Sequence, residues 1–163
     1  TFRRIGEAAA RLRIAESPVA VGELRHLLGI EEAERRRDAG GILGAAATRA
    51  LAAIPAQLGF YLTQELFAAG DYRRAVPGLT LATELAPGSS FLLYHLACAQ
   101  ARSGLPEGAL ASLERSLDHG LVQPSQIATD ADLASLRDRP EFARLLARAR
   151  ELEAAATTSP APQ

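Results

Sequence analysis

The chain has 163 residues, which is long enough for one domain with a buried core, and its 48% hydrophobic and 23% charged residues are typical of a globular protein. Eighteen basic residues balance nineteen acidic ones without a block of like charge at either end, which argues against a nucleic-acid partner. The single cysteine, Cys98, excludes an internal disulfide and a cysteine-based metal cluster.

Amino-acid usage and periodicity both favour helices. All basic residues are arginine and alanine is abundant, a bias typical of a GC-rich bacterial genome, and both residue types are good helix formers. Nearly every segment places its apolar residues at the 3.6-residue helical period, and none sustains a period of two. We therefore expect an all-α fold.

The N-terminal segment, residues 1–55, is expected to be helical throughout. Its first helix should end near Ala15. Ser17-Pro18 then offers an N-cap followed by proline at the first helical position, so a second helix should begin there and end at Gly29.

A third helix is predicted from Ile30 to Asp38. Its glutamates precede its arginines by four positions, so Glu31 should pair with Arg35 and Glu32 with Arg36. Such pairing is typical of a solvated face, and it is a better interpretation of the arginine run than a nucleic-acid patch.

A fourth, alanine-rich helix is predicted from Ile42 to Ile54, buried in the core and stopped by Pro55. The longest apolar stretch of the chain runs from Ile42 to Leu62. Because Arg49, Pro55 and Gln57 interrupt that stretch, we expect no membrane span.

The middle of the chain repeats with a period of 34 residues. The matched pairs are Leu62 and Leu96, Gly70 and Gly104, Ala75 and Ala109, Leu79 and Leu113, and Ala82 and Ser116. This period, with turn glycines and small residues where helices cross, resembles the tetratricopeptide repeat. The resemblance implies a short solenoid with two repeats, residues 56–89 and about 90–123, each an antiparallel pair of helices A and B, preceded by the N-terminal helices.

The chain departs from the family pattern at three places. Gly59 stands where the family has a large aromatic residue, and the second repeat ends in Asp118-His119-Gly120 instead of a proline. Pro77 lies inside helix B of the first repeat, which it should kink or shorten.

Residues 124–153 contain a second recognisable string, D-x-D-L-x-x-L-R-x-x-P-x-F-x-x-L from Asp130 onward. It resembles the region that closes small tetratricopeptide groups in bacterial proteins, and it implies helices that cap the last repeat. Thr129 and Asp132 are expected to form a capping box, and Pro140 to begin the final helix. The apolar stripe of that helix is Phe142, Leu145, Leu146 and Ala149. Residues 154–163 are expected to be a disordered tail.

The usual catalytic and phosphate-binding motifs are missing from the sequence. The glycine-rich Gly40-Gly41-x-x-Gly44 follows a helix and lacks the Lys-Ser/Thr of a phosphate loop, so it is interpreted as a helix junction. His26, His95 and His119 are not at metal-ligand spacing, and each is interpreted as a surface or repeat-face residue.

Two further groups of residues could have a chemical role, but both are interpreted as structural. Asp130 and Asp132, with Glu141 nearby in the sequence, are interpreted as helix N-terminal acids in preference to a cation site. Cys98, on helix A of the second repeat, is interpreted as a buried packing residue without a base beside it. No cofactor is therefore expected.

The resemblance implies that helix A lines a concave, partner-binding face. The candidate binding residues on this face are Gln57, Tyr61, Gln64, Tyr94, His95 and Arg102. The other aromatic residues of the two helices, Phe60, Phe67 and Phe91, are expected in the core rather than on the binding surface. The chain has no lysine or asparagine, so it lacks the carboxylate clamp with which some family members hold C-terminal peptides.

The function expected is a non-enzymatic module for protein–protein interaction, binding a peptide or a neighbouring domain on the helix-A face. The alternative is a C-terminal helical accessory domain of a larger bacterial enzyme, for example of the α/β-hydrolase type. Two repeats are too shallow for a third hypothesis, a small-molecule carrier. Self-association stays open, and the compartment is not predicted.

Overall fold

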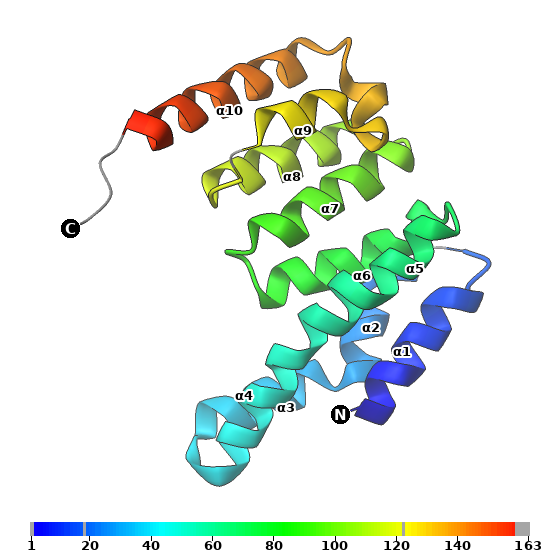
Figure 1. The fold of residues 1–163 in the computed structure, drawn as a ribbon. Coiled ribbons are helices and arrows are strands. Elements are labelled where there is room, and N and C mark those ends of the chain that lie inside the picture. The colour runs from blue at the N-terminus through cyan, green and yellow to red at the C-terminus, as the bar shows by residue number, and fades with distance from the viewer. Residues whose placement is uncertain (1, 18, 122, 159–163) are drawn as a thin grey trace. The chain divides into compact units, whose positions relative to one another are not determined.

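The computed structural model describes residues 2–17, 19–121 and 123–158. Every regular element in these ranges is helical, which confirms the all-α prediction (Figure 1). The chain divides into two compact units, Thr1–Gly88 and Ser89–Gln163, described below as unit 1 and unit 2.

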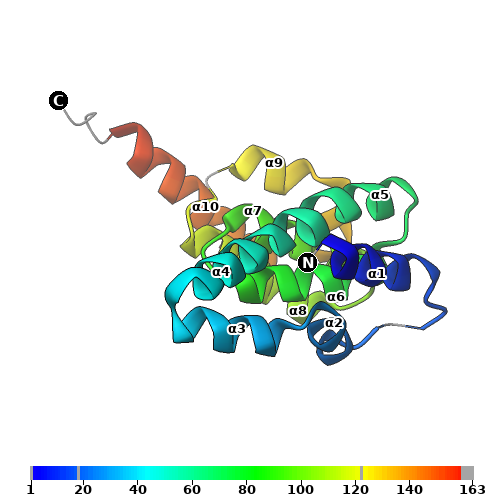
Figure 2. The same cartoon turned by 90° about the horizontal axis from the view of Figure 1, so that it is seen from below.

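In the described part of unit 1 there are six α-helices and one π-helical turn. They are α1 (Phe2–Ile14), α2 (Val21–Leu28), α3 (Ile30–Ala39), α4 (Gly41–Ala56), η1 (Gln57–Leu62), α5 (Thr63–Ala68) and α6 (Tyr72–Leu85). Seen from below, α3 and α4 run side by side as an antiparallel hairpin (Figure 2). Leucine and isoleucine side chains from α1, α2, α4, η1 and α6 are fully buried and form the core.

The second helix begins later than predicted. It begins at Val21 after Ala20, whose side chain provides no cap, so the expected start at Ser17-Pro18 is wrong; Pro18 itself lies outside the described residues. The late start is explained by packing in the connection between α1 and α2. Ala15 and Val19 are buried, so this segment delivers apolar side chains to the core and does not coil into a helix.

Pro55 does not stop the fourth helix, contrary to the prediction. It lies inside α4, and helical backbone continues through the π-helical turn to Ala68. Pro55 removes one backbone N–H from the ladder, and the next turn widens to the π geometry, in which carbonyls find partners five residues later. The hydroxyl of Thr63 donates to the carbonyl oxygen of Leu58 at 3.0 Å and so helps to satisfy this turn.

The fourth helix is also less buried than predicted. Its Ala47, Leu51 and Ile54 enter the core, but Ile42 and Leu43 in its first turn are 89% and 71% exposed. By length and composition alone, the run Gly41–Ala68 is the one described helix that could cross a membrane, and 28% of its most apolar window is buried.

Pro77 does not shorten α6, which spans 14 residues. Pro77 and its neighbour Gly78 are both buried, and a Cβ on Gly78 would lie 3.3 Å from Cδ1 of Leu12. The small residue therefore allows α1 to approach α6 closely.

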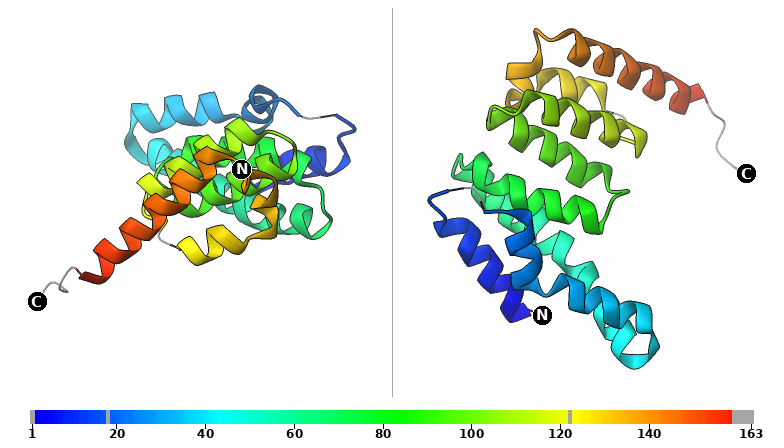
Figure 3. Two further views of the ribbon diagram at one scale, coloured as in Figure 1. Left: turned by 90° about the horizontal axis from the view of Figure 1, so that it is seen from above. Right: turned by 180° about the vertical axis from the view of Figure 1, so that it is seen from behind.

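Unit 2 consists of a helix pair followed by a closing segment. Its elements are α7 (Ser90–Arg102), α8 (Pro106–Asp118), α9 (Pro124–Thr129), the 3-10 helix η2 (Ala131–Leu136) and α10 (Pro140–Thr158). The α7–α8 pair is antiparallel and packs along its whole length, and α10 lies against α8 and α9 (Figure 3).

The two turns predicted from the 34-residue period have the same geometry. Gly70 and Gly104 both adopt left-handed backbone, with φ of 71° and 74°. After each glycine, a backbone N–H reaches back five residues, from Asp71 to Leu66 at 2.8 Å and from Leu105 to Gln100 at 2.9 Å. The following helices begin 34 residues apart, so the period describes real turns inside the two units.

The closing segment differs from the prediction in its cap and its end. The cap of η2 is Asp130, whose Oδ1 accepts from the N–H of Asp132 at 2.9 Å, whereas the hydroxyl of Thr129 donates back to the carbonyl of Ser125. The Thr129–Asp132 capping box is therefore wrong. Pro140 begins α10 as predicted, but the helix continues to Thr158 because Ala154–Ala156 are strong helix formers. Residues 159–163 lie outside the described part.

Candidate functional site

The predicted helix-A residues fall into two groups. Gln57, Tyr61 and Gln64 belong to unit 1, and Tyr94, His95 and Arg102 belong to unit 2. We describe each group within its own unit.

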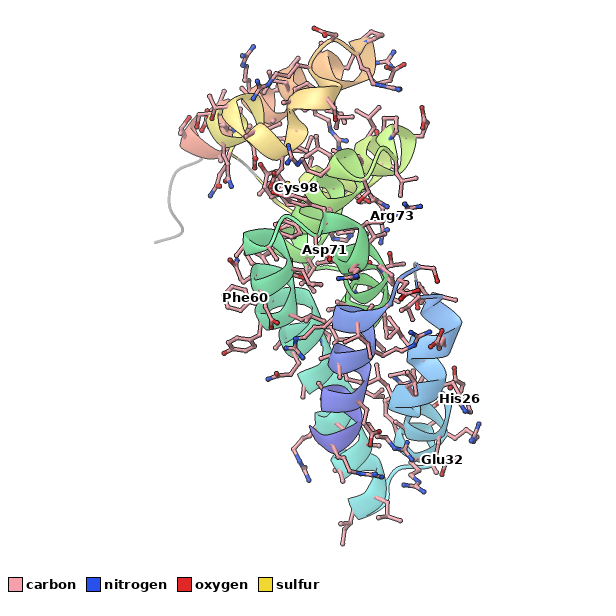
Figure 4. All side chains as sticks on the ribbon, turned by 90° about the vertical axis from the view of Figure 1, so that its right-hand side faces the viewer. His26, Glu32, Phe60, Asp71, Arg73 and Cys98 are labelled. Carbon is pink, nitrogen blue, oxygen red and sulfur yellow. The ribbon has the colours of Figure 1, made fainter. Side chains whose placement is uncertain are left out.

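In unit 1 the π-helical turn presents two aromatic rings to solvent. Phe60 and Tyr61 are 42% and 62% exposed, and their rings meet edge to face with centroids 5.2 Å apart. Figure 4 shows Phe60 pointing away from the helical run. The prediction of a core position for Phe60 is wrong, because Leu58 and Leu62 occupy the inward positions of this turn.

Beside this turn lies a shallow hollow of about 250 Å³ against α1. Gln57 and Tyr61 line it, whereas Gln64 is exposed and does not. Glu65 accepts two hydrogen bonds of 2.7 Å from the guanidinium of Arg13 at its margin. The hydrogen bonds from Arg13 lower the pKa of the Glu65 carboxyl.

In unit 2 a larger hollow, about 480 Å³, opens between α7, the end of α8 and α9; we call it the α7–α9 hollow. Its lining residues are Ser90, Phe91, Tyr94, His95, Gly120, Leu121, Gln123 and Gln126. The lining contains no acidic residue and no arginine. The lining combines aromatic faces with hydroxyl and amide groups that both donate and accept hydrogen bonds.

The aromatic part of this hollow is a pair of rings in tilted contact, those of Phe91 and His95. Phe91 is 43% exposed, which overturns the prediction that it is a core residue, and its ring centroid lies 4.1 Å from that of His95. The Nδ1 atom of His95 is 2.9 Å from the carbonyl oxygen of Phe91. In the tautomer that donates this hydrogen bond, Nε2 is left as an acceptor. Phe67 of α5 is half-buried, and its ring centroid lies 4.7 Å from that of Tyr72.

Tyr94 lines the same hollow but is itself 4% exposed. Its hydroxyl donates to Oδ2 of Asp130 at 2.7 Å, so the polar tip that made Tyr94 a binding candidate is already bonded within the protein. Asp130 also caps η2 through its other oxygen, and Arg137 donates to its backbone carbonyl at 3.0 Å. Tyr94 and Asp130 together fasten α7 to the closing segment.

Cys98 lies one turn after Tyr94 on α7, with its sulfur 3.9 Å from Oδ2 of Asp130. Burial, together with the charges of Asp130 and Asp132, raises the pKa of the thiol. Burial and the hydrogen bond to Asp130 likewise raise the pKa of the Tyr94 phenol. Both groups are therefore neutral at physiological pH, which agrees with the interpretation of Cys98 as a packing residue.

Potential ligand atoms of Cys98, Asp130 and Asp132 all lie within 4.8 Å of one another, and Glu141 is not part of this group. Both oxygens of Asp130 already accept hydrogen bonds. The exposed Arg102 places Nε 3.7 Å from Oδ1 of Asp132. The arrangement thus has the features of a helix cap, which is the interpretation the sequence favoured for these acids.

The remaining candidates lie outside both hollows. His26 and His119 are exposed surface residues. Gly44 allows α3 and α4 to approach, because a Cβ there would lie 2.9 Å from the carbonyl oxygen of Arg36, so the glycine-rich segment forms a tight helix junction. Of the predicted ion pairs, Glu32 binds Arg36 at 2.7 Å.

The other predicted pair is replaced. Glu31 accepts a hydrogen bond from Arg25 at 3.1 Å, and Arg25 also forms ion pairs with Glu34 and Glu84. Arg35 pairs with Glu32 instead of Glu31. Arg25 draws Glu31 away because it meets three carboxylates from α3 and α6 at once.

The chain matches none of the family models, curated proteins or solved structures with which it was compared. The resemblance to the tetratricopeptide family therefore stays a prediction, and the functional argument depends on the geometry of the two units.

Proposed function

We propose that this chain is a non-catalytic protein-interaction module of the tetratricopeptide type, which binds a peptide or a neighbouring domain on its helix-A face. The observation that carries the proposal is the α7–α9 hollow, with the exposed Phe91 in contact with the ring of His95 along its side. Exposed aromatic residues beside a hollow are typical anchors in protein interfaces.

The chemistry of the hollow indicates what it would bind. The amide groups of Gln123 and Gln126 can pair with the N–H and C=O groups of an extended peptide backbone. Phe91 and Leu121 offer apolar contact to a side chain of the same peptide. With no acidic or arginine side chain in the lining, affinity should depend little on ionic strength.

A binding experiment on the full chain tests this proposal. Peptides selected from a random display library on the immobilised protein serve as the probe, and their affinity is measured by calorimetry. We expect Phe91→Ala to weaken binding by about tenfold or more, because it removes the exposed anchor. Increasing the salt concentration from 0.1 to 0.5 M should change the affinity by less than about threefold.

Leu105→Ala is the matched control, since Leu105 lies in the same unit, is 48% exposed and does not line the hollow. This variant should bind like the wild type. Peptides that bind equally well to Phe91→Ala and His95→Ala variants would remove the α7–α9 hollow from the proposal.

A further inference from the structure

The tip of the α3–α4 hairpin exposes apolar side chains to an unusual degree. Ile42 and Leu43 are 89% and 71% exposed, and Ile42 is the most exposed large hydrophobic side chain among the described residues. Within unit 1, the hairpin extends beyond α1 and α2, and α3 packs mainly on α4, which also contacts α6 and η1 (Figures 1 and 3). Nothing in the packing of unit 1 accounts for two solvated aliphatic residues at this turn.

Positive charge surrounds this tip. From Arg35 to Arg49 the sequence contains four arginines and one acidic residue, Asp38, which gives a formal charge of +3. The glutamates of α3 precede these arginines along the helix, and Glu32 forms ion pairs with Arg35 and Arg36. Arg35, Arg36 and Arg37 have side chains that are 69%, 59% and 45% exposed, and all three are in ion pairs at the surface. Surface ion pairs of this kind are weak and readily exchange for another anion.

A hollow of about 360 Å³ extends the same surface along the hairpin. Its lining combines Arg4 and Arg36 with Leu43 and a row of alanines of α4, and it also includes Glu32, which forms an ion pair with Arg36. Apolar and cationic groups therefore lie together both at the tip and beside it.

We propose that the hairpin tip docks on an anionic lipid surface. Ile42 and Leu43 enter the boundary between headgroups and acyl chains, and the arginines around them meet lipid phosphates. This is shallow, peripheral attachment, and the rest of the run Gly41–Ala68 stays packed in unit 1. The proposal is independent of the α7–α9 hollow, which belongs to the other unit.

A second copy of the chain fits this surface less well. Symmetric pairing of one tip with another would bring two arginine-rich clusters together. Two side chains at a narrow tip also offer far less than the roughly 800 Å² per partner that a stable interface buries. A bilayer requires neither a large flat surface nor a complementary protein charge.

Co-sedimentation of the full chain with lipid vesicles tests the proposal. The vesicles contain phosphatidylglycerol and phosphatidylcholine in equal parts, and vesicles of phosphatidylcholine alone serve as the comparison. We expect binding to the anionic vesicles only, with a loss of about tenfold or more in the Ile42→Ser/Leu43→Ser double variant. Arg35→Gln/Arg37→Gln, and separately 0.5 M salt, should weaken binding by several-fold, because the phosphate contacts are electrostatic.

Ile14→Ser is the matched control, because Ile14 is 74% exposed in the same unit but lies at the end of α1. This variant should sediment like the wild type, and circular dichroism should show unchanged helix content in every variant. Failure of the wild type to bind anionic vesicles would overturn the proposal, as would full binding by the Ile42→Ser/Leu43→Ser variant. A dimer in solution that Ile42→Ser/Leu43→Ser dissociates, without vesicle binding, would assign the tip to self-association instead.

Discussion

At the scale of single residues, the Asp130 carboxylate has the largest structural role in unit 2. One of its oxygens caps η2 and the other accepts the hydroxyl of Tyr94, a residue 36 positions earlier in the chain. The sequence showed the acid but not this partner, because Tyr94 meets Asp130 only after α7, α9 and η2 have packed.

Asp130→Ala should therefore destabilise the protein by about 2–4 kcal/mol, since it removes a cap and leaves a buried phenol without its acceptor. Tyr94→Phe should cost less, about 1–2 kcal/mol, and the two effects should not add, because both variants break the same hydrogen bond. Urea unfolding of the two single variants and the double variant measures this. Asp138→Ala is the control, with an exposed side chain and an expected change within about 0.5 kcal/mol. Additive losses would show that the bond contributes nothing.

A pH dependence follows from the same cluster. The pKa values of Cys98 and Tyr94 are raised in the folded protein above their ordinary values of 9.0 and 10.0, chiefly by burial. Their contribution to stability is complete below pH 9 and is lost as the pH rises, because the unfolded chain then ionises while the folded one does not. We expect thermal stability to fall from about pH 9 upward, and to fall less in Cys98→Ala. An identical alkaline profile for Cys98→Ala would rule out a contribution from the thiol.

At the scale of elements, the structure separates what local sequence determines from what packing determines. The turns at Gly70 and Gly104 and the start of α10 at Pro140 depend on backbone preferences, and the sequence predicted them. The helix through Pro55 did not follow from local rules, because the π-helical turn that accommodates it is stabilised by buried neighbours such as Leu58. At Pro55, tertiary contacts therefore outweigh the tendency of proline to end a helix.

The two turn glycines lend themselves to a paired test. Both have left-handed backbone and open space where a Cβ would be, so Gly70→Ala and Gly104→Ala should each cost about 1 kcal/mol through backbone strain alone. Gly22→Ala, in the first turn of α2 with equally open space, should be neutral or stabilising. Chemical unfolding measures all three. A cost for Gly22→Ala as large as for the other two would contradict the assignment of the turns.

At the scale of the whole molecule, the division into units after Gly88 lies within one residue of the predicted boundary between the two repeats, after Ser89. The boundaries predicted at 55/56 and 123/124 fall inside units, because the first helix A is continuous with α4 and because α9 packs with α10. The all-α class followed from periodicity, whereas the exposure of Phe60, Phe91 and Ile42 did not. An apolar residue in a helical pattern is ordinarily assigned to the core, and only the packing shows which ones remain outside.

The central claim is that this chain binds a peptide or protein through the α7–α9 hollow. The most direct measurement is an NMR titration of the isotope-labelled full chain with a library-selected peptide. The account predicts that the largest amide shifts occur at residues lining the hollow, among them Phe91, His95, Gln123 and Gln126, and disappear in the Phe91→Ala variant. Shifts concentrated elsewhere, with the amides of the hollow unchanged at saturation, would contradict it.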